Sequence, residues 1–262
     1  MKIEIKNLCR TIASDIRKIV LKNIETNLVS LGKNVGIGAD GTPTEYIDKI
    51  AEDIALKHVK KSKVAVNILS EEAGFFDFGG EYTLIIDPID GTRNAVRGIP
   101  FYATSIAVGK DTLNSVEYGI VMNIPTGDTY IAEKGEGVYL NNRRISAPQH
   151  VSGKILSSLV LGESGDSRAK RLPYFDNVRS LGAASLEMCL VAHGAIDCFL
   201  CLKKHLRITD IAAATLIVRE AHGVVCDRKG RELNMPSDVL ERVSVIASVN
   251  KEILSRLLTT ID

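Results

Sequence analysis

The chain has 262 residues, enough for one or two domains with a sizeable hydrophobic core. Its 33 basic residues nearly balance its 32 acidic residues, and the net charge of +1 gives no field that would attract nucleic acid or an anionic membrane surface. The content of 45% hydrophobic and 25% charged residues is typical of a folded globular chain and excludes a disordered one. We expect a cytoplasmic protein, because there is neither a signal peptide nor an apolar run of about 18 residues, and the five cysteines suit buried thiols.

The first half predicts helices followed by a sheet. Apolar residues recur at steps of three and four from Ile5 to Ile24 and again from Ile47 to about Lys61, which predicts two helices with buried stripes. Four glycines and a proline between Gly32 and Thr44 predict a mobile loop that joins them. Short runs rich in β-branched residues then predict strands at 64–69, 82–87, 102–108, 116–123 and 128–133. We therefore expect helices packed on a sheet that is largely an antiparallel meander.

Beyond about residue 144, strands and helices alternate, as is typical of an α/β region. Strands are predicted at 158–162, 178–180, 197–202 and 243–247, and helices at 184–193, 210–221 and 251–261. No linker separates the two halves. The sequence thus predicts an α+β subdomain over 1–145 and an α/β subdomain over 146–262, which share one core.

The most informative segment is D-P-I-D-G-T, Asp87 to Thr92, directly after the apolar run Leu84–Ile86. Its proline fixes the backbone and its glycine lets N–H groups approach a ligand, so two carboxylates three residues apart can face one cavity. Converging carboxylates either raise the pKa of one of them or bind a hard cation such as Mg²⁺. A plain turn is the alternative for this segment taken alone.

Further acids lie at the ends of other predicted elements. Glu71 and Glu72 follow a strand, and Asp210 opens a helix, where it could be only an N-cap. Taken together, carboxylates from three segments are what a multi-metal phosphoryl-transfer site requires, because cations neutralise the leaving oxygen and activate water.

At this point a resemblance becomes specific. The stretches L-I-I-D-P-I-D-G-T-R-N (84–94), T-D-I-A-A-A-T-L-I-V-R-E-A-H-G (209–223), S-E-E-A-G (70–74) and G-V-Y-L-N-N-R-R-I (137–145) occur in order along the chain. With them the chain resembles the inositol monophosphatase family of Mg²⁺-dependent, lithium-inhibited phosphatases, which include fructose-1,6-bisphosphatases. The resemblance implies a layered αβαβα sandwich and a homodimer.

The resemblance also implies the metal ligands. Two or three Mg²⁺ ions would be bound by carboxylates and one main-chain carbonyl, at Glu71, Asp87, Asp90 and Asp210 and at Ile89. Glu71 is thereby counted among the catalytic residues as well.

The same resemblance assigns the phosphate site and the attacking water. Backbone N–H groups of Gly91 and Thr92, beside Asp90, would bind the phosphate, and Thr92 with a loop carboxylate would orient the water. The family's loop aspartate matches Thr44 or Thr42 here, and Asp40 is the acid nearby. We therefore expect Asp40 to serve as base and third-metal partner.

Two segments match the family's substrate side. The stretch 179–189 matches its sugar-facing loop, which would place four residues at the polyol site, namely Arg179, Gly182, Ala183 and Ser185. The stretch before Asp210 carries Lys203, Lys204 and Arg207, as in archaeal enzymes that act on both inositol phosphate and fructose 1,6-bisphosphate. These cations would suit a second phosphate, and a solvated basic loop is the alternative.

We therefore expect a phosphomonoesterase that acts on fructose 1,6-bisphosphate and myo-inositol 1-phosphate. A 3′-phosphoadenosine 5′-phosphate phosphatase and a non-catalytic metal- or phosphate-binding relative are the alternatives. Cys198 and Cys201 have the spacing of a zinc knuckle but lie in an apolar run, which favours buried thiols. The uncharged segment Gly98–Gly109 could be part of a dimer interface or a core strand.

Overall fold

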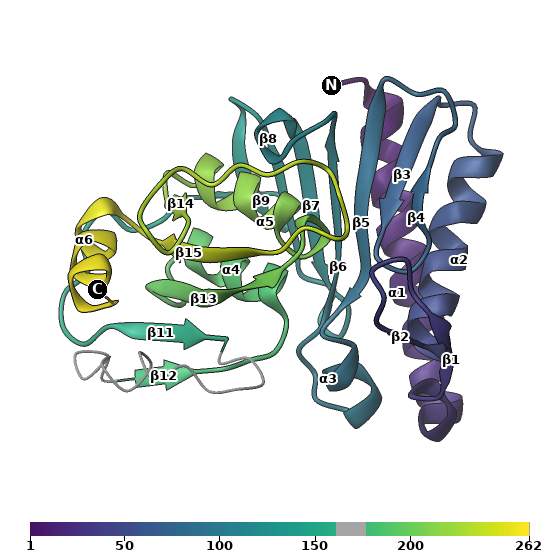
Figure 1. Cartoon of the computed structure of the whole chain (residues 1–262), viewed down its shortest axis with the longest axis horizontal. Coiled ribbons are helices and arrows are strands. Elements are labelled where there is room, and N and C mark those ends of the chain that lie inside the picture. The colour runs from purple at the N-terminus through teal and green to yellow at the C-terminus, as the bar shows by residue number, and fades with distance from the viewer. Residues whose placement is uncertain (161–176, 262) are drawn as a thin grey trace.

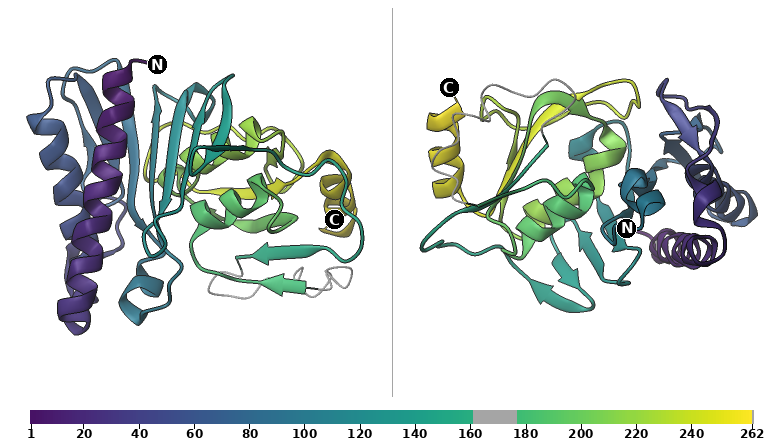
Figure 2. Two further views of the ribbon diagram at one scale, coloured as in Figure 1. Left: turned by 180° about the vertical axis from the view of Figure 1, so that it is seen from behind. Right: turned by 90° about the horizontal axis from the view of Figure 1, so that it is seen from below.

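The computed structural model describes residues 1–160 and 177–261. Within these residues, the elements form five layers: two helices, an eight-stranded sheet, two helices, a five-stranded sheet and one helix (Figures 1 and 2). This is the predicted αβαβα sandwich. None of the described helices combines the length and the apolar character that crossing a bilayer would require.

The outer helical layer consists of α1 (Ile3–Leu31) and α2 (Tyr46–Lys61), which pack side by side on one face of the large sheet. The predicted stripe of α1 is buried, but the helix continues seven residues beyond its predicted end at Ile24. The predicted loop after it is instead an antiparallel hairpin of β1 (Asn34–Ile37) and β2 (Pro43–Glu45). Its signal was the turn pair Asp40-Gly41, in which Gly41 has a φ of 85° that favours glycine.

The large sheet has the strand order β10-β9-β8-β7-β6-β5-β3-β4. Its strands are β3 (Val66–Ser70), β4 (Gly74–Phe76), β5 (Tyr82–Asp90), β6 (Ala103–Gly109), β7 (Tyr118–Asn123), β8 (Thr129–Glu133), β9 (Gly137–Leu140) and β10 (Arg143–Ile145). β3 and β5 run parallel, and β5 to β10 form the predicted antiparallel meander. The sequence analysis missed β4, β9 and β10, which have only three or four residues each.

The D-P-I-D segment is the end of β5 rather than a plain turn. The pairing of β5 with β6 shifts register between Asp87 and Asp90, which accommodates Pro88 without an N–H donor. Gly91, with a φ of 90°, then starts the short helix α3 (Thr92–Arg97), which the sequence analysis missed.

The inner helices α4 (Ala184–Ala192) and α5 (Ile208–Glu220) lie between the two sheets (Figure 1). The second sheet has the order β12-β11-β13-β15-β14, and α6 (Lys251–Ile261) covers its outer face. Its strands are β11 (Leu156–Leu159), β12 (Asn177–Arg179), β13 (Cys198–Leu206), β14 (Val224–Cys226) and β15 (Val243–Ser248).

Other predicted boundaries shift. The predicted strand 158–162 is found as β11, two residues earlier, and positions 161 and 162 lie outside the described residues. The predicted strand 116–123 starts later, because a 3₁₀ turn, η1 (Leu113–Ser115), leads into β7. β14 was missed, and β13 runs four residues past its predicted end.

The segment 98–109 supplies β6, in which all seven residues are buried, so the core-strand interpretation is confirmed for Ala103–Gly109. One hydrophobic cluster takes residues from both sides of position 145, including Ile85 and Ile217. The division into 1–145 and 146–262 stays a prediction.

Candidate active site

The topology brings three predicted metal ligands to one place. β3 and β5 are parallel neighbours with Ser70 opposite Ile86, so Glu71 and Asp87 emerge at the same edge of the sheet. The first turn of α5 adds Asp210. One carboxylate oxygen from each of these three residues lies within 4.8 Å of the others.

Burial and mutual repulsion disfavour the charged form of the carboxylates gathered here. Burial, followed by the charges of Asp90 and Asp210, raises the pKa of Asp87 well above its ordinary value. Burial also raises the pKa of Asp90 to about 7, with a contribution from Asp210. A divalent cation would relieve this repulsion, and carboxylate oxygens are the donors that Mg²⁺ prefers. The residues present therefore fit the predicted metal.

Asp90 is held by the start of α4. It accepts hydrogen bonds from the backbone N–H groups of Ala184 at 3.1 Å and Ser185 at 2.7 Å, and from Ser185 Oγ at 2.6 Å. The positive end of the helix dipole stabilises the carboxylate there. Ser185, predicted to line the polyol site, thus contacts a predicted metal ligand.

Thr92 and Ile89 are brought to the same edge. Thr92 Oγ1 lies 2.9 Å from the carbonyl oxygen of Ile89, and a second lone pair on that oxygen remains for a cation. The N–H groups of Gly91 and Thr92 have no acceptor among the described residues, which suits their predicted contact with phosphate.

The carboxylate that contacts Thr92 is Asp48, which the sequence analysis missed. Thr92 Oγ1 lies 2.8 Å from Asp48 Oδ1. Burial raises the pKa of Asp48 to about 8, because the Thr92 hydrogen bond does not compensate for desolvation and for the charges of Glu72 and Glu45. A signal existed: Asp48 lies one turn before Ala51 and two before Ala55, so it is an acid within the buried stripe of α2.

Asp40 also reaches the site, through different partners. Its carboxylate accepts hydrogen bonds from Thr42 N at 2.8 Å and Thr42 Oγ1 at 2.7 Å, and pairs with Arg207 at 2.7 Å and Arg242 at 3.2 Å. Although burial raises the pKa of Asp40, these contacts outweigh it and hold the pKa below its ordinary value. Its predicted role as base stays a prediction.

Arg207 lies among the acids rather than apart from them. Its guanidinium pairs with Asp210 at 2.9 Å, with Asp40, and with Glu71. The side chain is only 17% exposed, so its positive charge compensates buried negative charges. Arg207 was expected to face a second phosphate, whereas in the structure it binds predicted metal ligands.

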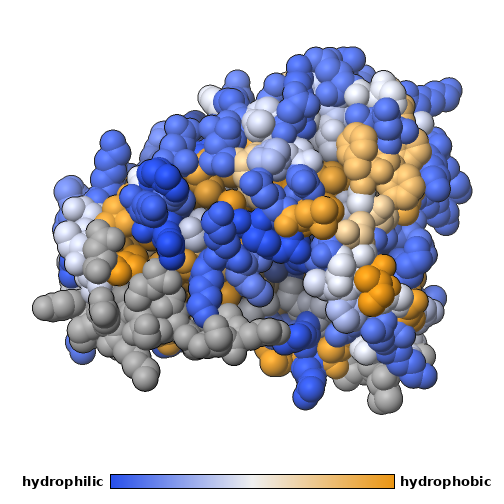
Figure 3. Space-filling view, in the orientation of Figure 1, coloured by the Kyte–Doolittle hydropathy of each residue, from blue (hydrophilic) through white to orange (hydrophobic). Residues whose placement is uncertain are grey.

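The basic stretch is not a loop. Lys203 and Lys204 belong to the last part of β13, where Lys203 is half-buried and Lys204 exposed. On this face of the molecule hydrophilic side chains are interspersed with hydrophobic ones (Figure 3).

Gly182 and Ala183, two of the other predicted substrate residues, form a turn beside Gly91. A Cβ at Gly91 would lie 3.0 Å from the carbonyl oxygen of Gly182 and from the Cβ of Ala183, so glycine is required for this close approach. The N–H groups of Gly182 and Ala183 point to the carboxylate of Glu187. Arg179 is exposed on β12, and its guanidinium donates to the carbonyl of Val178.

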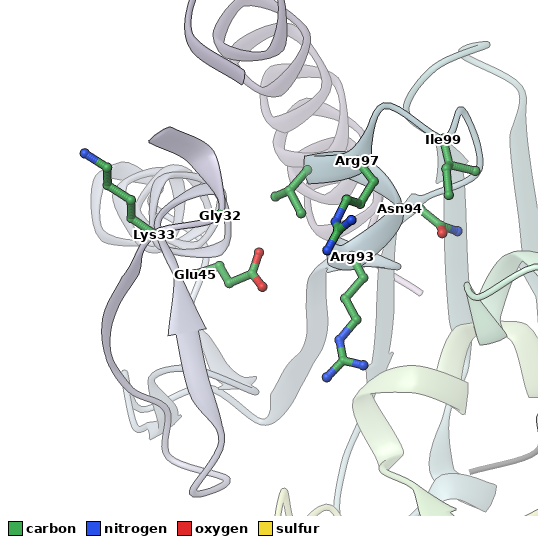
Figure 4. Close-up of a pocket in the computed structure, with 8 residues that line it drawn as sticks. Gly32, Lys33, Glu45, Arg93, Asn94, Arg97 and Ile99 are labelled. Carbon is green, nitrogen blue, oxygen red and sulfur yellow. The ribbon is translucent and has the colours of Figure 1, made fainter. Parts of the chain in front are cut away.

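A pocket of about 730 Å³ lies between α3 and the residues Gly32, Lys33 and Glu45 (Figure 4). Glu45, at the end of β2, faces Arg93 and Arg97 of α3 across it. The pocket lining does not include the acidic cluster. The five cysteines are buried free thiols, as predicted for Cys198 and Cys201.

Comparison with known proteins agrees with this geometry. The sequence model of the inositol monophosphatase family matches residues 4–262 of this chain. A fructose-1,6-bisphosphatase/inositol-1-monophosphatase of Methanothermobacter thermautotrophicus is 39% identical over 249 residues, which cover 88% of each chain. A bifunctional NADP phosphatase/NAD kinase of Methanococcus maripaludis is 38% identical over 264 residues, but the match spans only 46% of that protein and 90% of this chain.

A solved structure gives the same result. The crystal structure of an inositol monophosphatase-fructose 1,6-bisphosphatase superposes with a TM-score of 0.86 at 35% identity, covering 99% of this chain and all of the other. The family match, the similar fold and the acids at the ends of β3 and β5 agree. The chain belongs to the inositol monophosphatase family.

Proposed function

We propose that the protein is a Mg²⁺-dependent phosphomonoesterase that acts on fructose 1,6-bisphosphate and myo-inositol 1-phosphate. The observation that carries the proposal is the convergence of Glu71, Asp87 and Asp210 within 4.8 Å, together with the N–H groups of Gly91 and Thr92, which have no acceptor among the described residues. The activities named for the relatives at 35–39% identity support the substrate class.

The chain's own residues can bind and orient the reactants. The N–H groups of Gly91 and Thr92 bind phosphate oxygens. The Thr92 hydroxyl, held between Asp48 and Ile89, has lone pairs that can receive a hydrogen of the attacking water. Asp48 holds the Thr92 hydroxyl at 2.8 Å, and we add it to the proposed site as a positioning residue.

Mg²⁺, when bound by Glu71, Asp87, Asp90 and Asp210, would activate water and neutralise charge on the leaving oxygen. The proposal includes two or three ions for this set of ligands.

The experiment is phosphate release from myo-inositol 1-phosphate and fructose 1,6-bisphosphate, with Mg²⁺ and with EDTA. We expect release that requires Mg²⁺ from both substrates. No release from either would overturn the proposal and favour a non-catalytic relative.

NADP is the second candidate substrate, favoured by the 38% identity to the bifunctional NADP phosphatase/NAD kinase. NADP and 3′-phosphoadenosine 5′-phosphate belong in the same panel. A kcat/KM for NADP more than tenfold above those for the sugar phosphates would replace the first proposal by this one.

We also propose that Lys203 binds the second phosphate of fructose 1,6-bisphosphate. Lys203→Ala should raise the KM for the bisphosphate and leave that for inositol 1-phosphate unchanged. Lys204→Ala, a neighbouring exposed lysine on the same strand, is the matched control. Equal effects of Lys203→Ala on both substrates would exclude this role.

The remaining part of the proposal is a homodimer in the cytoplasm. Buried free thiols suit a reducing compartment. Sedimentation equilibrium of the purified protein tests the dimer, and a monomer at micromolar concentration would contradict it.

A further inference from the structure

A buried carboxylate lies beneath the turn that faces Gly91. Glu187, in the first turns of α4, is 1% exposed. Its Oε1 accepts hydrogen bonds from Gly182 N at 2.9 Å and Ala183 N at 3.3 Å, and its Oε2 accepts one from Leu181 N at 3.4 Å and one from the hydroxyl of Ser158. One side chain therefore satisfies three consecutive backbone donors. We call Leu181–Ala183 the substrate-side turn.

The substrate-side turn is held from its other side by α3. Asn94 Nδ2 lies 2.7 Å from the carbonyl oxygen of Leu181 and 2.7 Å from that of Phe101. Gly182 has a φ of 86°, and a Cβ there would lie 3.1 Å from the Asn94 amide. The turn is thus fixed between Glu187 and Asn94, with little freedom to shift.

The position of this turn matters to the site. The carbonyl oxygen of Gly182 lies against Gly91, and the next residues, Ala184 and Ser185, donate to Asp90. Glu187 occupies the N–H groups of Gly182 and Ala183, and its own backbone N–H donates to the Ala183 carbonyl, so the Gly182 carbonyl is the group that this turn can offer to a ligand. No described residue donates to the Gly182 carbonyl, whose oxygen can accept a hydrogen bond from a hydroxyl group.

We propose that Glu187 is a positioning residue, which fixes the substrate-side turn so that the Gly182 carbonyl meets a hydroxyl of the sugar or polyol part of the substrate. This inference rests on the proposed function. Glu187 itself touches neither the substrate nor the reacting atoms. Glu187 holds the substrate-side turn in the required position before the substrate binds. The free energy of substrate binding is then not reduced by the entropy lost in ordering the turn.

The test compares myo-inositol 1-phosphate with para-nitrophenyl phosphate, whose leaving group has no hydroxyl for the turn. Glu187→Gln replaces one acceptor oxygen by a donor, so it cannot accept all three N–H groups. We expect the KM for inositol 1-phosphate to rise about tenfold, as the loss of one well-placed hydrogen bond would produce. The KM for para-nitrophenyl phosphate should change less than threefold. Ser158→Ala removes a single donor to Glu187. It should shift the ratio of the KM for inositol 1-phosphate to that for para-nitrophenyl phosphate in the same direction, by a smaller factor.

The control is Glu220→Gln. Glu220 likewise accepts two backbone N–H groups, from Gly135 and Gly137 at 2.9 Å each, but lies at the other end of α5, about 15 Å from Asp210 along the helix. Its substitution should leave the ratio of the two KM values unchanged.

Hydrogen exchange gives a readout that does not depend on activity. Amide exchange of Leu181, Gly182 and Ala183 should become faster in Glu187→Gln than in the wild type. An active wild type with an unchanged KM ratio in Glu187→Gln, or with unchanged exchange, would overturn the positioning role alone. A wild type inactive on both substrates would overturn the proposed function and the substrate role of the turn, while the exchange result would still show whether Glu187 holds it.

Discussion

Arg207 should compete with Mg²⁺ for the acidic cluster. In the structure its guanidinium pairs with Asp40, Glu71 and Asp210, whose side chains are 0%, 16% and 7% exposed. Arg207→Ala leaves these charges uncompensated when no cation is present. Removing one partner of a buried ion pair costs roughly 3–5 kcal/mol, and we take about 3 kcal/mol because the acids can protonate or hydrate.

The magnitude follows from this loss. For a chain of 262 residues, about 3 kcal/mol lowers the Tm in EDTA by roughly 6–12 °C. With saturating Mg²⁺ the cation replaces the guanidinium, so the Tm should come close to that of the wild type. Because the free form is destabilised and the loaded form is not, Mg²⁺ should bind about 100-fold more tightly to the variant, at 1.36 kcal/mol per tenfold change.

The assay is calorimetric Mg²⁺ titration together with thermal melts in EDTA and in Mg²⁺. Arg231→Ala is the control, since Arg231 pairs with Asp227 at 2.6 Å but is 70% exposed, so its loss should change neither measurement. Mg²⁺ affinity that is unchanged or weaker in Arg207→Ala would refute the reasoning.

Three further predictions concern the same edge of the sheet. Asp90→Asn should lower kcat more than 100-fold and weaken Mg²⁺ binding measured by calorimetry; full activity would contradict its role as a ligand. In EDTA, wild-type stability should fall as pH rises from about 4 to about 8, because folded Asp48 keeps its proton to about pH 8 whereas the unfolded chain loses it near 3.8. Asp48→Asn lacks this pH-dependent contribution to stability, so the Tm of the variant minus that of the wild type should rise between pH 5 and pH 8.5. If the Tm values of the two proteins run parallel with pH, Asp48 is not a buried acid with a raised pKa. Gly91→Ala should lower kcat/KM at least tenfold in steady-state assays, because of its φ of 90° and contacts at 3.0 Å, and wild-type kinetics would show that the turn can yield.

The sequence was sufficient for the elements with a clear period. The stripes of α1 and α2 predicted the outer helical layer, because burial on one face imposes a spacing of about 3.6 residues on a helix. Short runs rich in β-branched residues predicted β5 and β6, which are buried on both faces. Short strands such as β4 and β10, with three residues each, carry no measurable period and were missed. The β1–β2 hairpin was predicted as a loop, because its two strands have only four and three residues and the segment is rich in glycine, which is typical of loops.

The predicted acidic ligands also followed from local sequence. Asp87 and Asp90 lie at the end of one strand and Glu71 follows its parallel neighbour, so their proximity is a consequence of strand pairing alone. The motifs that carry the family resemblance contain these residues, and the structure brings Glu71, Asp87 and Asp210 together.

What only the tertiary structure decided is which side chains act on those ligands. Asp48 meets Thr92 across 44 positions, and Arg207 meets Glu71 across 136. Glu187, a single acid in an apolar helix, has its role set by the Leu181–Ala183 turn that folds back over it. A local sequence pattern specifies the type of residue and the face of the element on which it lies. A buried charge requires a counter-charge or hydrogen-bond donors. Which residues supply them depends on how segments distant in the sequence pack against each other.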